Sequence, residues 1–254
     1  MQSIKTIYKI GPGPSSSHTF GPMMASKYIN EQYPEATNFK ITLFGSLALT
    51  GKGHLTDKII LKTLGTSKCE IIFDMKTPVE HPNTMIIEVF DKDTKIAEHT
   101  FVSIGGGKIE IDGKKGNVDP EIYPHTKMDD IQVYCNERHL RLDQYIDEVE
   151  DSDFDSYMNQ IFKQMLKTVN TGLKKTGVLP GSLKIDRVAH ALHQSAQSCN
   201  DIQDKNSLLL SSYAYAANEQ NASGGIVVTA PTMGSCGVLP SLVYHFYYDQ
   251  NYPK

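Results

Sequence analysis

Apolar and polar residues alternate along several stretches of the first hundred residues, a pattern that predicts half-buried β-strands. The predicted strands are residues 39–44, 69–75, 85–91 and 95–104. Two other stretches, 21–33 before the first strand and 54–65 after it, carry apolar residues at helical spacing instead, and in the second of these Ile59, Ile60 and Leu64 share one face. We therefore expect the first half of the chain to form a sheet with two helices packed on it.

Helical periodicity replaces this alternation near residue 140. The predicted helical stretches are 140–177, 182–197 and 206–223. An acidic run from Glu148 to Asp155 lies within the first of them, and it is most simply a solvated helix start or a linker. The pattern predicts an α+β fold, in which an N-terminal, sandwich-like α/β domain (1–150) is followed by an all-helical domain (151–254).

Composition and charge narrow the choice of partners. The 254 residues carry a net charge of -4 and no dense cluster of lysine and arginine, which argues against nucleic acid and anionic membrane surfaces as partners. No stretch reaches the ~18 consecutive apolar residues of a membrane span, and the first residues lack the apolar core of a signal peptide. The four cysteines form no CxxC pair, so neither a disulfide framework nor a local zinc site is indicated. These features predict a cytoplasmic protein.

The stretch GPGPSSSHTFGP, residues 11–22, is the first candidate for chemistry. Glycine permits unusual backbone angles, proline stiffens the chain, and the serine hydroxyls lie among backbone N–H donors. Such a loop can hold a carboxylate, and the helix predicted to follow it would add an N-terminus that favours negative charge. The same residues also suit a helix-capping turn in which His18 closes a hydrogen bond. The residues alone leave both readings open.

The stretch GSLALTGKGH, residues 45–54, directly follows a predicted strand and presents Lys52 and His54 after it. The imidazole of a histidine suits proton transfer near neutral pH, although a lone histidine is more often structural. The spacing of a phosphate-binding P-loop is absent, which excludes that kind of nucleotide site here.

Residues 221–240 place the apolar run Ile226 to Val228 between two turns rich in glycine and hydroxyl groups. Such turns can form the wall of a small-molecule site, or they can be a tight packing element between helices. We interpret Cys236 as a packing residue, because no neighbouring base is visible in the sequence and buried thiols are usually inert.

Taken in order, these motifs resemble those of the iron-sulfur L-serine dehydratases. The matching motifs are GPSSSHT, GSLALTGKGH, HPN at residues 81–83, GVLPGSL around residue 180, and ASGGIVVTAPT followed by GSCG. The resemblance covers essentially the whole chain, in the single-chain form that joins a β domain (1–150) to an α domain (151–254, incomplete).

The resemblance implies an enzyme that converts L-serine to pyruvate and ammonia without pyridoxal phosphate. It also implies a 4Fe-4S cluster that polarises the substrate hydroxyl as a Lewis acid, with His54 taking the Cα proton. The substrate-binding residues that it implies are Ser15, Ser16, Ser17, His18, Thr19, Lys52, Asn221, Ser223, Gly224, Thr229 and Thr232.

The cysteines depart from this family pattern. The three cysteines that hold the cluster in the family lie in GCQ, TCDP and PCIE motifs, and residues 1–254 contain none of these motifs. The resemblance implies that the cluster cysteines would lie beyond Lys254. Cys236 lies in the GSCG turn and does not replace them, so the sequence predicts no metal ligand in this chain. Met233 also departs from the polar or small residue that the family often has there.

This departure predicts an incomplete enzyme. We expect a fragment, or one part of a split enzyme that is inactive alone and needs a complementing α-domain polypeptide. A homodimer is a further expectation.

Two alternatives stay open at this point. The chain can be a non-catalytic module that binds a small amino acid or hydroxy acid and regulates a partner, using the same serine-rich loop. It can also be a nonfunctional remnant whose apolar helix faces aggregate. Added iron, sulfide and a complementing polypeptide separate the first from an enzyme, because only an enzyme would then yield a coloured, oxygen-sensitive complex that makes pyruvate, whereas a module would bind its ligand without colour.

Overall fold

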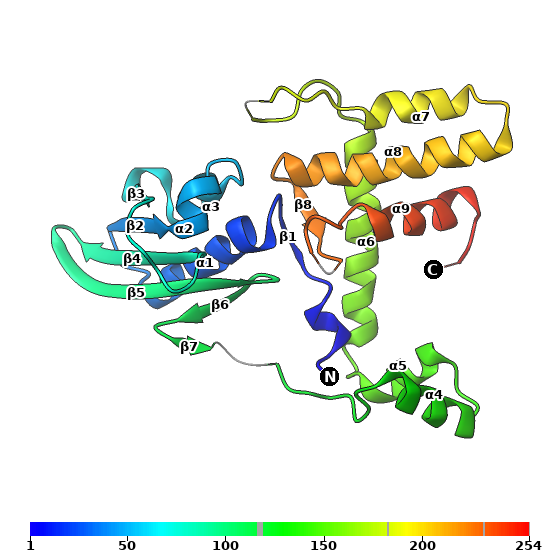
Figure 1. Cartoon of the computed structure of the whole chain (residues 1–254), viewed down its shortest axis with the longest axis horizontal. Coiled ribbons are helices and arrows are strands. Elements are labelled where there is room, and N and C mark those ends of the chain that lie inside the picture. The colour runs from blue at the N-terminus through cyan, green and yellow to red at the C-terminus, as the bar shows by residue number, and fades with distance from the viewer. Residues whose placement is uncertain (116–118, 182, 231, 254) are drawn as a thin grey trace.

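The computed structural model describes residues 1–115, 119–181, 183–230 and 232–253. Figure 1 shows a sheet with helices on one side of the molecule and a second group of helices on the other, with α4 (Met128–Glu137) and α5 (Leu142–Val149) below this second group. None of the described helices is long and apolar enough to cross a membrane. The arrangement confirms the expected α+β fold, because the mixed sheet precedes a mostly helical region.

Within the described residues the larger sheet has the strand order β3-β2-β4-β5-β6-β7. Its strands are β2 (Asn38–Phe44), β3 (Cys69–Asp74), β4 (Thr84–Asp91), β5 (Thr94–Gly105), β6 (Lys108–Ile111) and β7 (Lys114–Lys115). Only β2 and β3 run parallel, and the other neighbours pair antiparallel. The four strands predicted from alternation correspond to β2 through β5.

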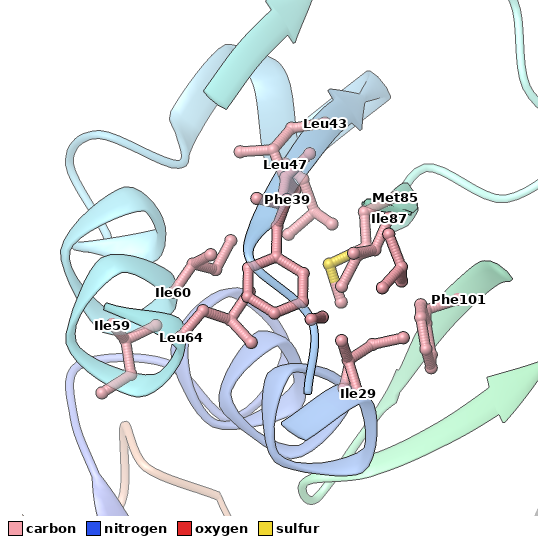
Figure 2. Close-up of a cluster of buried hydrophobic side chains, with 14 of the residues drawn as sticks. Ile29, Phe39, Leu43, Leu47, Ile59, Ile60, Leu64, Met85, Ile87 and Phe101 are labelled. Atoms are coloured by element: carbon pink, nitrogen blue, oxygen red, sulfur yellow. The ribbon is translucent and has the colours of Figure 1, made fainter. Parts of the chain in front are cut away.

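The core of this part lies between the sheet and two helices, α1 (Gly21–Gln32) and α3 (Thr56–Leu64), as Figure 2 shows. Phe39, Ile41 and Leu43 alternate along β2 onto one face and are 4%, 0% and 0% exposed. Side chains this deeply buried contribute roughly 1.5–3 kcal/mol each. The apolar residues that alternate along the sequence thus form the inward face of the sheet.

The helical part is built from α6 (Phe154–Leu173), α7 (Ala189–Gln197), α8 (Ile202–Ala222), α9 (Val238–Tyr244) and the π-helical turn η4 (His245–Asp249). Gly172 lets α6 and α8 approach closely, since a Cβ there would lie 2.2 Å from the carbonyl oxygen of Ala216. Buried Val169 and Tyr213 belong to the same core cluster. The helix predicted at 206–223 corresponds to α8.

Two of the predicted helices differ in extent from the helices of the structure: one is shortened and the other is divided. Residues 183–188 are not helical, because Leu179 N–H donates to Ile185 O (2.8 Å) and Arg187 N–H donates to Gly177 O (2.8 Å), which makes a short hairpin. The helix α7 begins only after it, where the buried Glu219 carboxylate accepts the first N–H groups. The predicted 140–177 helix is likewise divided into α5 (Leu142–Val149) and α6, after the separate helix α4 (Met128–Glu137).

Glu150 lies at the break between α5 and α6, and its carboxylate is buried. It accepts hydrogen bonds from Ser3 Oγ (2.6 Å), Ile4 N–H (2.8 Å) and Tyr123 Oη (2.7 Å). These bonds compensate for the loss of water around the charge. The interpretation of the acidic run as solvated is therefore wrong at Glu150, which attaches the start of the chain to α5.

The first twelve residues lie against the helical part before the chain enters the sheet. The 3-10 turn η1 (Ile4–Thr6) is followed by β1 (Ile10–Pro12), which pairs antiparallel with β8 (Ile226–Val228). The buried Thr229 hydroxyl reinforces this pairing by donating to Ile7 O (2.7 Å). The division into domains at residue 150 stays a prediction, while this pairing brings the first residues of the chain beside the segment that follows α8.

Candidate active site

The serine loop, residues 13–19, leads from β1 into the π-helical turn η2 (Ser16–Phe20), which continues as α1. Ser15 Oγ accepts the His18 N–H (3.1 Å), and Thr19 Oγ1 accepts the Ser15 N–H (3.2 Å). These are the bonds of a capping turn. The Ser16 hydroxyl and the N–H groups of Ser16 and Ser17 have no hydrogen-bond partner among the described residues, so these groups at the start of the turn are available to a ligand.

The turn between α2 (Gly45–Thr50) and α3 holds the serine loop from one side. Thr19 Oγ1 donates to His54 O (2.7 Å), and Thr56 Oγ1 donates to His18 O (2.5 Å). Both threonines are buried. The two motifs that the sequence analysis singled out in the first half of the chain therefore form one structure.

His54 lies at this junction, half-buried, with its Nδ1 3.1 Å from Thr50 O. A carbonyl oxygen only accepts hydrogen bonds, so in the neutral ring Nδ1 carries the proton. The other nitrogen, Nε2, then has a free lone pair. This tautomer is the one that a general base needs.

The His18 ring stacks at a tilt on His54, with ring centroids 4.7 Å apart. Its Nδ1 lies 2.9 Å from Ser17 Oγ, and its Nε2 lies 2.8 Å from Ser46 Oγ. Burial, together with the neighbouring His54, lowers the pKa of His18 below its usual value of 6.5. His18 is therefore neutral at neutral pH, and both of its nitrogens are engaged by hydroxyl groups.

The end of α8 contacts the serine loop from the helical part. Asn221 Nδ2 donates to Pro14 O (3.2 Å), and Gly13 N–H donates to Gly225 O (2.9 Å). The Gly13-Pro14 peptide bond is cis. Gly224 lies against Leu55, next to His54, at a distance that leaves little room for a side chain. Three segments far apart in the sequence thus meet around the serine loop and His54.

By the active enzyme containing this chain we mean the chain together with its complementing α-domain polypeptide. We expect Gly13→Ala to lower kcat/KM of this enzyme by roughly 10²-fold, because displacing a site by about 1 Å has an effect of this size. A Cβ at this position would lie 2.1 Å from Asn221 Oδ1 and 2.4 Å from Asn221 O, so the serine loop must move away from α8. Gly234→Ala is the matched control, since its nearest neighbour is 3.8 Å away. Initial-rate kinetics of both variants test this. Equal rates for the two would contradict it.

The remaining predicted site residues lie further from this junction or use their side chains elsewhere. Lys52 is exposed, with its ammonium 5.1 Å from the centroid of the Phe73 ring. Ser223 Oγ donates to Glu219 O (2.6 Å) and so caps α8, while Thr229 is occupied by the β1–β8 pairing. Thr232 is exposed and lies 3.0 Å from Ser235 Oγ in its own turn. Their roles toward substrate stay predictions.

The cysteines do not fit an iron-sulfur cluster. Cys69, Cys135, Cys199 and Cys236 lie in four separate elements or turns, and among the described residues no three His, Cys, Asp or Glu side chains gather as a metal site would require. Burial raises the pKa of the Cys69 thiol to about 11 and that of Cys236 to about 12. Cluster ligands are thiolates, which these environments disfavour. The structure agrees with the interpretation of Cys236 as a packing residue, since it is 1% exposed.

Three positions that the sequence analysis used lie outside the described residues. Lys254, beyond which the resemblance places the cluster cysteines, is one of them, and the others are Ser182 in the GVLPGSL motif and Pro231 in the ASGGIVVTAPT motif. The expectation that the cluster ligands follow Lys254 therefore stays a prediction.

Comparison with known proteins identifies the class to which this fold and site belong. The sequence-family model of the serine dehydratase beta chain matches residues 3–72 of this chain. The sequence-family model of the serine dehydratase alpha chain matches residues 44–252. The second match spans most of the chain. The chain therefore belongs to the serine dehydratase family, as the resemblance of its motifs predicts.

The curated relatives agree with this assignment. The chain is 32% identical to L-serine dehydratase 2 of Escherichia coli (strain K12), with 98% of this chain and 66% of the relative covered. It is 29% identical to L-serine dehydratase of Haemophilus influenzae, with 97% and 66% covered, and 32% identical to that of Helicobacter pylori (strain 26695), with 96% and 65% covered. The chain spans about two thirds of the length of the curated relatives it matches.

Proposed function

We propose that this chain binds L-serine and removes its Cα proton, as part of an L-serine ammonia-lyase that forms pyruvate and ammonia. The observation that carries the proposal is the junction at His54, where a ring nitrogen with a free lone pair lies beside a loop able to hold a carboxylate. The name L-serine dehydratase shared by the curated relatives supports the same substrate.

The serine loop is suited to the carboxylate of the substrate. The N–H groups at the start of a helical turn have no intrahelical acceptor and favour negative charge. The Ser16 hydroxyl is available at the same place. Because Asn221 and Gly13 fix this turn against α8, the loop would receive the substrate without reorganising.

His54 would then act as the general base. Its Nε2 takes the proton from Cα, the electrons of the broken C–H bond form the Cα=Cβ bond, and hydroxide leaves Cβ and becomes water by taking up a proton. The resulting aminoacrylate tautomerises to an imine, and water hydrolyses this imine to pyruvate and ammonia. The hydrogen bond from Nδ1 to Thr50 O stabilises the imidazolium that forms.

The 4Fe-4S cluster implied by the resemblance does not fit the cysteines of this chain. We propose that its thiolate ligands come from outside these four residues, and that the chain by itself does not turn over L-serine. The chemistry above is accordingly assigned only to groups that the chain supplies.

Calorimetric titration with L-serine tests binding, and anaerobic incubation with iron and sulfide followed by a pyruvate assay tests turnover. We expect wild-type chain to bind L-serine, Ser16→Ala to bind it more weakly, and the incubated chain to stay colourless and inactive. Absence of L-serine binding would overturn the proposed function. A coloured chain that forms pyruvate would overturn the placement of the cluster ligands. If the chain, supplied with iron, sulfide and a complementing polypeptide, bound L-serine without forming pyruvate, the chain would be a binding module.

A further inference from the structure

Ser46 is the second residue of α2, and its backbone is fixed from two directions. Its N–H donates to Pro82 O (2.7 Å), in the HPN segment, and its carbonyl oxygen accepts the Thr50 hydroxyl (2.9 Å). Gly45 makes this close approach possible, since it has a φ of 50° and a Cβ there would lie 2.7 Å from Pro82 O. The Ser46 hydroxyl therefore extends from a rigid position toward His18.

His18 has no ring nitrogen left for a substrate, because Ser17 and Ser46 engage one nitrogen each. What the ring presents to the site is its face, which lies against His54. An imidazole that is hydrogen-bonded at both nitrogens cannot rotate about its Cβ–Cγ bond without breaking a hydrogen bond. The His18 ring is thus a fixed packing surface for His54 and does not serve as an acid or base.

The two hydroxyl partners of His18 differ in origin. Ser17 is the neighbouring residue and moves with the serine loop, whereas Ser46 belongs to α2. The other end of the same short helix supplies Thr50 O, which sets the tautomer of His54. A single short helix therefore contacts both imidazoles, one through the Ser46 hydroxyl and the other through the Thr50 carbonyl.

We propose that Ser46 is a positioning residue of this site: its hydroxyl locks the His18 ring, and the ring in turn holds His54 with Nε2 toward the substrate. The inference rests on the proposed function for the role of His54, but the contact itself is independent of turnover. The Ser46 hydroxyl is hydrogen-bonded to His18 Nε2, so the role assigned to Ser46 is exerted through His18.

Ring-nitrogen NMR of the 15N-histidine-labelled chain at one neutral pH tests the contact directly. We expect wild type to show His54 with Nδ1 protonated and Nε2 unprotonated. Ser46→Ala should shift the His18 nitrogens and give His54 the averaged signals of two tautomers, while Ser46→Thr, which keeps the hydroxyl, should retain the wild-type spectrum. Signals are assigned with His18→Gln and His54→Gln. His99, hydrogen-bonded to Tyr33 and Asp112, serves as the internal reference for folding.

Kinetics of the active enzyme containing this chain provide the second readout. Ser46→Ala should lower kcat by about 10- to 100-fold, the effect of a slightly misplaced base, with KM changed by less than about 3-fold. Ser46→Thr should recover most of that loss.

The possible results separate the two proposals. Unchanged His18 and His54 signals in Ser46→Ala would overturn the positioning role. An equal loss of kcat in the alanine and threonine variants would also overturn it. Neither result would contradict the proposal that the chain binds L-serine. Wild-type chain that fails to bind L-serine would overturn the proposed function and, with it, the catalytic part of this inference. A shifted His99 signal in Ser46→Ala would mean a general structural change and would also overturn the specific role.

Discussion

His54→Gln is expected to lower kcat of the active enzyme containing this chain by about 10²- to 10⁴-fold, the range typical of a lost general base. Glutamine preserves a hydrogen bond to Thr50 O but has no basic nitrogen to receive the Cα proton. Because His54 is not needed to hold the carboxylate, KM should change much less than kcat. Steady-state kinetics with L-serine measure both constants.

His139→Gln is the matched control for this variant. His139 is exposed just after α4, and none of its side-chain atoms hydrogen-bonds to a described residue. Its replacement should leave kcat within about 2-fold, as expected of a surface substitution away from the site. If His54→Gln kept wild-type kcat while still binding L-serine, another group would have to be the base.

Phe101→Ala is expected to lower the free energy of unfolding of the sheet part by about 3–5 kcal/mol, the usual range for removing a buried phenylalanine. Phe101 lies on β5, is 0% exposed, and packs edge-on against Tyr28 of α1, with ring centroids 5.8 Å apart. Truncation would leave a cavity between the sheet and the helix that covers it. Urea unfolding followed by circular dichroism measures the change.

Tyr215→Ala provides the comparison for this stability measurement. Tyr215 is also aromatic but is 50% exposed on α8. Its truncation should change the free energy of unfolding by no more than about 0.5 kcal/mol. Equal losses in the two variants would mean that the cluster around Phe101 does not stabilise the sheet part.

The sequence predicts the sheet well because its pattern has a local cause. Alternation along 39–44 reflects a strand with one buried face, and β2 has this arrangement. The division of 140–177 is not predictable in the same way, since Glu150 is buried through partners at Ser3 and Tyr123 that are distant in the chain. Hydrophobic periodicity carries no information about such long-range bonds.

In the candidate site, too, features with a local sequence signal are predictable, whereas contacts between residues distant in the sequence are not. Glycine, proline and hydroxyl motifs indicate the serine loop and His54, and the structure brings these two together. The motifs do not single out Ser46, because its partner His18 is 28 positions away and one serine at a helix start has many ordinary explanations. Only the pairing of the two motifs in space reveals its contact with His18.

The antiparallel pairing of β1 with β8 affects how the site can form as the chain is made. The bond between Asn221 and Pro14 joins residues 207 positions apart, and the one between Thr229 and Ile7 joins residues 222 apart. Contacts between such distant residues close large loops and form late in folding. The serine loop leaves the ribosome among the first residues of the chain, yet its partners Asn221 and Gly225 exist only after residue 225 has been made. An incomplete nascent chain therefore carries the serine loop and His54 without the contacts that join them to the end of α8.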